Sequence, residues 1–114
     1  MRAVNKWHLD RLTLIVDCNG VQLDGTVAQI MPMDRLPEQL EAFGWRVLPC
    51  DGHDPKTLQE ALREAAECGE ACALVARTVK GKGVSFMEGQ SAWHGKPIGP
   101  EDYARAMAEL EAVR

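Results

Sequence analysis

The sequence predicts an α/β fold in which a parallel sheet of about three strands is flanked by helices. Three short apolar runs are typical of strands buried on both faces, and segments with helical spacing lie between them. The three runs are Leu12–Val16, Trp45–Cys50 and Ala73–Thr78. Because parallel strands need a crossover connection, this alternation favours right-handed strand–helix–strand units. No repeat or linker divides the chain, so we expect a single domain over residues 1–114.

The first half of the chain predicts two helices. Arg2–His8 has the character of the end of a helix, and no capping residue precedes it, so we expect a missing segment upstream. In Leu36–Phe43 the apolar residues share one helical face, Pro37 suits the first turn and Gly44 can end the helix. The strand Trp45–Cys50 follows directly.

The second half predicts two more helices and a long loop. Asp54 can cap a helix that has Pro55 in its first turn. The expected buried stripe of this helix consists of Leu58, Ala61, Leu62, Ala65 and Ala66. The glycine-rich stretch Lys80–Gly99 has no periodicity and is too long for a simple connection, which indicates a functional loop. Pro100 begins the last helix. Its expected apolar face consists of Tyr103, Met107 and Leu110.

The composition excludes several classes of protein. The net charge of −4 argues against a nucleic-acid surface, and no apolar stretch reaches the roughly 20 residues that cross a bilayer. The N-terminus lacks the apolar core of a signal peptide, so we expect a cytoplasmic protein with no membrane partner. A chain of 114 residues is small for an enzyme that encloses a large cofactor. We expect another segment or subunit to cover Leu12–Val16, which is too apolar for a sheet edge in water.

The four cysteines do not predict a metal site. Cys68 and Cys72 are one residue further apart than the common CxxC pair. Only three histidines could add ligands, namely His8, His53 and His94. Free thiols in a reducing compartment are the favoured interpretation.

Polar residues follow the first strand, at a position where open α/β sheets bind ligands. The side-chain oxygen of Asn19 is neutral and hard, and a backbone carbonyl at Gly20 or Val21 could supply a second oxygen. Magnesium is the cation that such oxygens suit. The alternative is an ordinary tight turn, which the sequence physics alone favours because Asn-Gly is a common turn pair.

Basic residues and a histidine follow the third strand. Lys80 and Lys96 could pair with diphosphate or sugar-phosphate charge, although surface lysines without a role are common. His94 lies between Trp93 and Gly95, so an aromatic neighbour could hold its ring while the glycine lets a ligand approach. The alternative is an exposed loop histidine without a role.

Five motifs occur in order along almost the whole chain. They are Asp10–Gly25, Ala42–Trp45, Asp51–Asp54, Thr78–Glu88 and Trp93–Lys96. Together they closely resemble transketolase. The similarity is to the C-terminal half of its thiamine diphosphate-binding module, as found in the N-terminal subunit of a split transketolase. The resemblance implies a partial thiamine diphosphate-binding fold.

The resemblance also implies an activity and roles for individual residues. The activity is transfer of a two-carbon ketol unit between sugar phosphates in the pentose phosphate pathway, with thiamine diphosphate and Mg²⁺ or Ca²⁺ as cofactors. Asn19 would ligate the metal through its side chain and Val21 through its backbone carbonyl. His94 would lie near the diphosphate and the donor sugar, where it can assist proton transfer. Lys80 and Lys96 would line the cofactor and substrate region.

Parts of the family pattern are missing. The Gly-Asp-Gly motif, whose aspartate binds the metal in the family, does not occur. The upstream sugar-binding histidines and the pyrimidine-binding domain are also absent. A magnesium ion held by one amide and one carbonyl would keep mostly water ligands. We therefore expect an oligomer in which a pyrimidine-binding subunit or the missing upstream segment is the partner, and no activity of the chain alone.

Two functions remain open at this point. The chain is either part of a transketolase that works only when complemented, or a non-catalytic remnant that keeps the fold as an interaction module. A generic nucleotide-binding domain is a weaker third interpretation, because the expected GxGxxG loop is absent.

Overall fold

The computed structural model describes residues 3–112. Its helices are α1 (Ala3–Trp7), α2 (Val27–Ile30), α3 (Leu36–Ala42), α4 (Pro55–Glu67), the short 3₁₀ helix η1 (Ser91–Trp93) and α5 (Pro100–Ala112). Its strands are β1 (Thr13–Cys18), β2 (Val21–Gln22), β3 (Gly25–Thr26), β4 (Arg46–Asp51) and β5 (Cys72–Arg77). The contacts within the chain define two compact units. We call them the sheet unit, residues 3–18 and 33–78, and the loop unit, residues 19–32 and 79–112.

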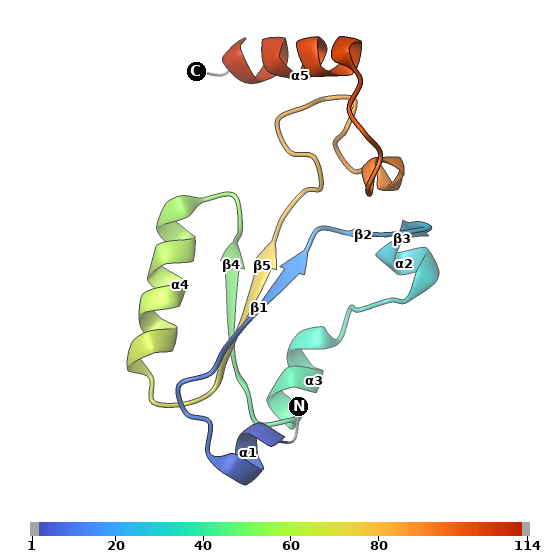
Figure 1. Cartoon of the computed structure of the whole chain (residues 1–114). Coiled ribbons are helices and arrows are strands. Elements are labelled where there is room, and N and C mark those ends of the chain that lie inside the picture. Colours follow the sequence, from blue (N-terminus) through green and yellow to red (C-terminus); the bar gives the residue numbers. More distant parts are fainter. Residues whose placement is uncertain (1–2, 113–114) are drawn as a thin grey trace. The chain divides into compact units, whose positions relative to one another are not determined.

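The sheet unit contains a parallel sheet of three strands in the order β1–β5–β4 (Figure 1). The central strand β5 is buried from Cys72 to Ala76 and has a neighbour on each side, with Ile15 and Leu48 both opposite Leu74. The strands are those predicted, shifted by one or two residues at their ends. The predicted fold class, a parallel sheet of about three strands flanked by helices, is confirmed.

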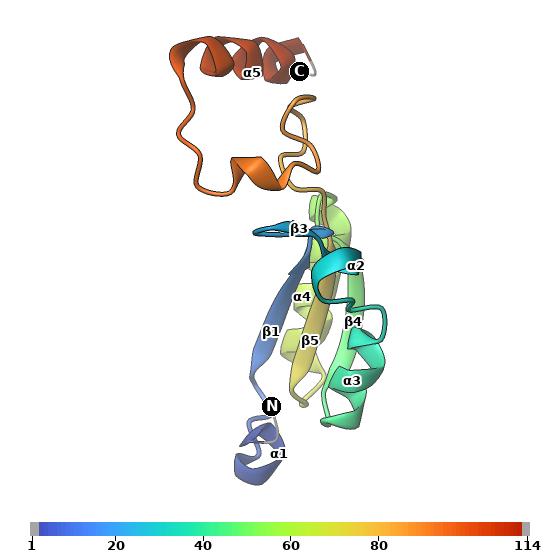
Figure 2. The same cartoon turned by 90° about the vertical axis from the view of Figure 1, so that its right-hand side faces the viewer.

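Helices cover both faces of this sheet (Figure 2). On the face of α1 and α3 the buried residues are Val4, Leu36, Leu40, Trp45, Ala71, Ala73 and Val75. On the face of α4 they are Leu48, Ala61, Ala65, Cys72 and Leu74. The predicted buried stripe of α4 is wrong at Leu62 and Ala66, which are exposed, and Leu58 is only half-buried. The reason is that α4 packs mainly against β4 and β5, so a narrow sheet covers only part of its apolar stripe.

The edge strand β1 leaves apolar side chains exposed. Leu12, which precedes the strand, is 41% exposed and Ile15 is 55% exposed. Within the strand, Leu14 and Val16 alternate with Ile15 and pack against the core on the other face. The sheet unit therefore has two exposed apolar side chains at β1, Leu12 and Ile15, that its own helices do not cover.

Local interactions fix the ends of α3 and α4 as predicted. Asp54 caps α4 because its Oδ1 accepts a hydrogen bond from the backbone N–H of Lys56 at 3.0 Å. After α3, Gly44 has a φ of +81°, and a Cβ there would lie 2.5 Å from Asn5 Nδ2. The same Asn5 nitrogen donates to the Phe43 carbonyl. Glycine is therefore required where α3 ends. The predicted helix end at the N-terminus corresponds to α1, and its residue Arg2 lies outside the described residues.

The first segment of the loop unit contains three elements that sequence periodicity did not predict. The strands β2 and β3 form a short antiparallel hairpin in which Val21 pairs with Thr26. Thr26 then caps α2, since its Oγ1 accepts a hydrogen bond from the backbone N–H of Gln29 at 3.3 Å. Two-residue strands and a four-residue helix are too short to give a recognisable hydrophobic period.

In the second segment, α5 packs against the long loop. Ala106 is buried together with Val84 and Met87. The predicted apolar face of α5 is wrong at Tyr103, which is 60% exposed, because the small Ala106 makes the central contact. Leu110 is 43% exposed but lies beside Gly83 of the loop. None of the helices within residues 3–112 has both the length and the apolar character needed to cross a membrane.

Candidate functional site

All of the predicted site residues belong to the loop unit. They are Asn19 and Val21 in its first segment and Lys80, His94 and Lys96 in its second. The two segments begin after neighbouring strands of the sheet, because Cys18 at the end of β1 is opposite Arg77 at the end of β5. The carboxyl ends of parallel strands are where open α/β folds bind ligands. The chain topology therefore connects both groups of predicted residues to the expected edge of the sheet.

Asn19 shapes the turn that follows β1. Its Oδ1 accepts a hydrogen bond from the backbone N–H of Val21 at 3.1 Å, and the side chain is half-buried. Gly20 has a φ of +77° with open space where a Cβ would lie, and its carbonyl accepts from the N–H of Val27. Asn19 and Gly20 thus do form a local turn, as the alternative interpretation predicted, while the hairpin itself turns between β2 and β3. This turn holds the Asn19 side chain beside the backbone of Val21.

The oxygen atoms at this turn fit only part of a metal site. Asn19 Oδ1 and the Val21 carbonyl are neutral oxygens of the kind that hard divalent cations accept. The nearby Asp17 carboxylate already accepts a hydrogen bond from the Thr78 hydroxyl. Burial, and to a lesser extent the charge of Asp17, raise the pKa of the Cys18 thiol. Within residues 3–112, no group of three or more His, Cys, Asp or Glu side chains could hold a metal ion. Further ligands would have to come from a cofactor, from water or from other polypeptide.

The glycine-rich loop after β5 folds back on itself. Gly81 has a φ of +72°, and a Cβ there would lie 2.6 Å from the Met87 carbonyl oxygen. The carbonyl of Lys80 accepts a hydrogen bond from the N–H of Gly89 at 2.9 Å, which closes the loop. The Lys80 side chain is half-buried. Glycine at position 81 therefore lets the backbone at residues 80–81 approach the backbone at residues 87–89 closely. It also fixes the backbone from which Lys80 extends.

Two glutamates hold this loop in place. The Glu88 carboxylate accepts a hydrogen bond from the N–H of Gly83 at 2.9 Å and lies 3.9 Å from the ammonium of Lys82. The Glu109 carboxylate, on α5, accepts hydrogen bonds from both the backbone and the hydroxyl of Ser85, the latter at 2.8 Å. These bonds from Ser85, the backbone bond first, lower the pKa of Glu109. The glutamates attach the loop to itself and to α5.

An aromatic stack that the sequence did not predict places Lys96. Its Nζ lies 3.9 Å from the centre of the Trp93 ring. Trp93 in turn packs edge-on against Phe86, with ring centres 5.6 Å apart, and donates its indole N–H to the Phe86 carbonyl. The Arg105 guanidinium lies 4.3 Å from the Phe86 ring centre. The one signal in the sequence is the proximity of Phe86 and Trp93 in a chain with few aromatic residues.

His94 is exposed at the end of η1. Its backbone N–H donates to the Ser91 carbonyl at 2.9 Å, which ends the short helix. The aromatic contacts of Trp93 are with Phe86 and Lys96, and the imidazole of His94 extends from an exposed turn next to Gly95. Gly95 has a φ of +79° and open space where a Cβ would lie. The arrangement gives a ligand access to the imidazole.

Comparison with known proteins identifies similar sequences over nearly the whole chain. A family model described as the transketolase thiamine diphosphate binding domain matches residues 3–111. The chain is 38% identical over 105 residues to the 6-deoxy-6-sulfo-D-fructose transketolase subunit of Clostridium sp. (strain MSTE9), covering 91% of this chain and 38% of that protein. It is 34% identical over 109 residues to an apulose-4-phosphate transketolase subunit of Phocaeicola vulgatus, covering 95% of this chain and 39% of that protein.

A solved structure agrees with these matches. The transketolase of Campylobacter jejuni superimposes with a TM-score of 0.88 at 29% sequence identity, covering 96% of this chain and 17% of that one. The chain thus spans about two fifths of the length of the curated subunits it matches and about a sixth of this transketolase.

Proposed function

Because the chain belongs to the transketolase thiamine diphosphate-binding domain family, we propose that it is part of a transketolase that transfers a two-carbon ketol unit between sugar phosphates. The observation that carries the proposal is the family match over residues 3–111, a range that contains all five predicted site residues. The sheet unit and the loop unit would together form one portion of a single cofactor-binding domain. A cytoplasmic location remains a prediction.

A divalent cation, Mg²⁺ or Ca²⁺, would bind at the turn after β1. Asn19 Oδ1 and the Val21 carbonyl would be its ligands from this chain, and the hydrogen bond from the Val21 N–H already orients the Asn19 amide. Magnesium takes about six oxygen ligands, so two neutral oxygens leave most positions to other donors. This turn alone is therefore expected to bind the cation weakly.

The lysines of the second segment would face the charged ligands. Thiamine diphosphate, when bound, would supply the nucleophilic carbon that receives the two-carbon unit. Lys80 is half-buried and makes no ion pair within the described part of the chain, so its ammonium is available to a diphosphate. Lys96 is held against Trp93 and would present its charge to a sugar phosphate from a fixed position.

His94 would act on the substrate side of the cofactor. An imidazole in a turn with open space at Gly95 can donate a hydrogen bond to a sugar hydroxyl or accept its proton. Proton transfer of this kind typically contributes about 10²–10⁴-fold to a rate. We therefore assign His94 to turnover rather than to binding of the metal.

The proposal includes a partner, namely the remaining polypeptide of a transketolase. The chain spans between 15% and 39% of the length of these curated relatives, and three of them are named as subunits. The exposed apolar side chains at β1, Leu12 and the 55% exposed Ile15, suit a surface that further polypeptide covers in an oligomer. Because residues 3–112 offer only two candidate oxygen ligands for the metal, we expect the chain to be inactive alone.

The proposal is tested by titrating thiamine diphosphate with Mg²⁺ into the full chain, with and without a candidate subunit that carries the rest of the enzyme. We expect cofactor binding and ketol transfer only in the mixture. If the mixture assembles but binds no cofactor, the chain is an interaction module and the proposal is wrong. Ketol transfer by the chain alone would also contradict it.

Variants of the assembly assign the residues. Asn19→Ala should weaken Mg²⁺-dependent cofactor binding about tenfold or more. Asn19→Asp keeps the acceptor for the Val21 N–H and should retain binding. His94→Ala should mainly lower kcat, whereas His53→Ala, an exposed histidine of the sheet unit, serves as its matched control. Unchanged binding in Asn19→Ala would remove that residue from the metal site.

A further inference from the structure

Two thiols meet where α4 ends and β5 begins. Cys68 is the C-terminal cap of α4, and Cys72 is the first residue of β5. Their Sγ atoms are 2.8 Å apart, and neither forms a disulfide. A disulfide bond is about 2.05 Å long, so the two sulfurs need to approach by only about 0.8 Å to become bonded. The turn between them, which includes Gly69 with a φ of +69°, already brings both side chains together.

The two thiols differ in their access to solvent. Cys72 is fully buried, and this burial together with the hydrogen bond that it shares with Cys68 raises its pKa to about 12. Cys68 is half-buried and lines an open pocket of about 330 Å³. The pocket is otherwise lined by Arg46, Glu60, Arg63, Glu64 and Glu67. A small oxidant can therefore reach Cys68 and not Cys72.

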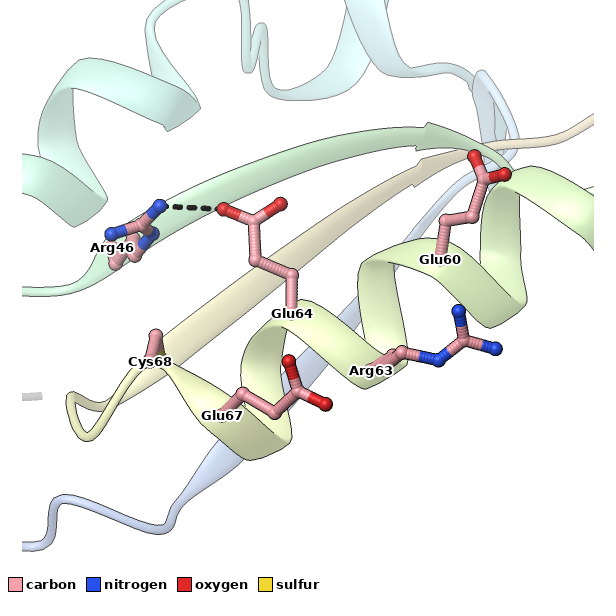
Figure 3. Close-up of a pocket in the computed structure, with 6 residues that line it drawn as sticks. All are labelled: Arg46, Glu60, Arg63, Glu64, Glu67 and Cys68. Atoms are coloured by element: carbon pink, nitrogen blue, oxygen red, sulfur yellow. Dashed lines mark hydrogen bonds and ion pairs between the residues drawn. The ribbon is translucent and has the colours of Figure 1, made fainter.

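Figure 3 shows the residues of this pocket along α4, with Arg46 on the neighbouring strand β4. Cys68 lies at the same end as Arg46, whose guanidinium is paired with Glu64 at 2.5 Å. A polar pocket of this kind admits water and a small polar oxidant such as a peroxide. The Cys68 sulfur, which lines the pocket, is thus the first to react. The Cys72 sulfur is buried next to it and reacts second.

The other two cysteines are not placed to pair. Cys18 lies in β1 and Cys50 in β4, with β5 between these strands. Neighbouring strands are about 4.8 Å apart, so two strand spacings exceed the Cα separation of about 7 Å that a disulfide tolerates. Cys18 and Cys50 therefore provide matched controls within the same chain. A metal site is also not available to the pair, since no group of three or more ligating side chains forms within residues 3–112.

We propose that Cys68 and Cys72 are a redox-active pair that forms a reversible disulfide when the protein meets a peroxide. With hydrogen peroxide as the oxidant, the Cys68 sulfur attacks one peroxide oxygen and the O–O bond breaks. The thiol proton passes to the leaving oxygen, which departs as water and leaves a sulfenic acid on Cys68. The Cys72 sulfur then attacks the Cys68 sulfur, the S–O bond breaks, and the leaving hydroxyl group takes the Cys72 proton and departs as a second water. Two thiols and one hydrogen peroxide thus give one disulfide and two waters, and two electrons pass from sulfur to oxygen.

The short ring makes this disulfide easy to reduce. Only Gly69, Glu70 and Ala71 lie between the two cysteines, and a short loop gains less from cross-linking of the unfolded chain than a long one. Disulfides with little stabilisation have higher reduction potentials and are the labile ones. A thiol reductant should therefore return the pair to the dithiol form seen in the structure.

The test is peptide mapping of the full chain after treatment with hydrogen peroxide. Cleavage after Glu67 and Glu70 separates the two cysteines, so a Cys68–Cys72 disulfide appears as two linked peptides whose mass is lower by two hydrogens than the sum of the reduced peptides. We expect this linked pair as the dominant product, and its loss after reduction. Linkage through Cys18 or Cys50, or a sulfinic acid at Cys68 beside a free Cys72, would overturn the proposal.

The variants leave the buried Cys72 unaltered, so that a folding defect at that position cannot account for the loss of the disulfide. Cys68→Ser, at a half-exposed cap, should abolish the linked peptides while the far-UV circular dichroism stays unchanged. The double variant Cys18→Ser/Cys50→Ser should form them as the unaltered chain does. If Cys68→Ser still yields linked peptides that contain Cys72, the proposed pair is wrong.

Discussion

The sheet unit and the loop unit are stabilised in different ways. The largest fully buried side chains, Leu40, Leu74 and Cys72, all belong to the sheet unit, whereas the buried cluster of the loop unit is Val84, Met87 and Ala106. The loop unit instead contains most of the glycines with positive φ. They are Gly20, Gly81, Gly83, Gly89 and Gly95, against Gly44 and Gly69 in the sheet unit. Side-chain packing thus stabilises the scaffold, while backbone conformation and charged contacts shape the segments that carry the predicted site.

The largest expected effect is a loss of packing in the sheet unit. Leu40→Ala removes a fully buried side chain between α3 and the sheet and should lower the free energy of unfolding by about 2–5 kcal/mol. Leu23→Ala, at a leucine of the loop unit that is 63% exposed, should change it by less than about 0.5 kcal/mol. Denaturant titration of both variants measures the difference. Equal effects would contradict the contrast between the two units.

Backbone strain should dominate in the loop unit. Gly81→Ala forces a Cβ to within 2.6 Å of the Met87 carbonyl at a φ of +72°, so we expect a loss of about 1–3 kcal/mol. Gly89→Ala is the matched control, because its φ is +68° but nothing lies within 4 Å of the new Cβ. Gly89→Ala should lower the free energy of unfolding only by the cost of placing an alanine in the left-handed conformation, about 1 kcal/mol. The same denaturant titration distinguishes the two, and equal losses would show that the contact with Met87 is relaxed easily.

The sheet unit was also the more predictable of the two. Its strands are long enough for a continuous apolar run, and its helices begin with unambiguous signals such as Asp54 followed by Pro55. The sequence does not predict which residues of a helix's apolar face the sheet buries. Leu62 and Ala66 fit the helical period of α4, yet they are exposed because the period says nothing about the width of the sheet beneath.

In the loop unit the sequence identified residues rather than geometry. The sequence predicts that Asn19 offers a hard side-chain oxygen to a metal. The structure adds that this Oδ1 accepts a hydrogen bond from the Val21 N–H. The contact between Lys96 and Trp93 is local in sequence, but the third member, Phe86, depends on how an aperiodic loop folds. No local pattern predicts such a contact, because loop conformation is decided by individual glycines and hydrogen bonds. The roles of Asn19, Val21, Lys80, His94 and Lys96 remain predictions.

A smaller effect is expected for the cation over Trp93. Lys96→Gln removes the ammonium that lies 3.9 Å from the ring centre. It should lower the free energy of unfolding by about 0.5–1 kcal/mol. A double-mutant cycle with Trp93→Leu isolates the pair from the other contacts of each residue. Lys82→Gln, whose ammonium pairs with Glu88 at 3.9 Å on the exposed loop, is the control with no coupling to Trp93. A coupling energy of zero between Lys96 and Trp93 would mean that the stack does not position this lysine.

The smallest effect is a pH dependence confined to the attachment of the loop to α5. Hydrogen bonds from Ser85 hold the pKa of Glu109 below its usual value, so the carboxylate stabilises the loop at neutral pH. This contribution is present above the unfolded pKa of about 4.3 and is lost as the pH falls through the lowered folded pKa. Hydrogen exchange of the Ser85 amide, which donates to Glu109, measures it directly. Glu109→Gln should expose this amide at neutral pH and match the unaltered chain in acid, whereas Glu111→Gln on the same helix should leave it protected. Protection that is equal in the unaltered chain and Glu109→Gln at pH 7 would show that the glycines alone hold the loop, and the contrast between the two units would then rest on backbone conformation without the charge.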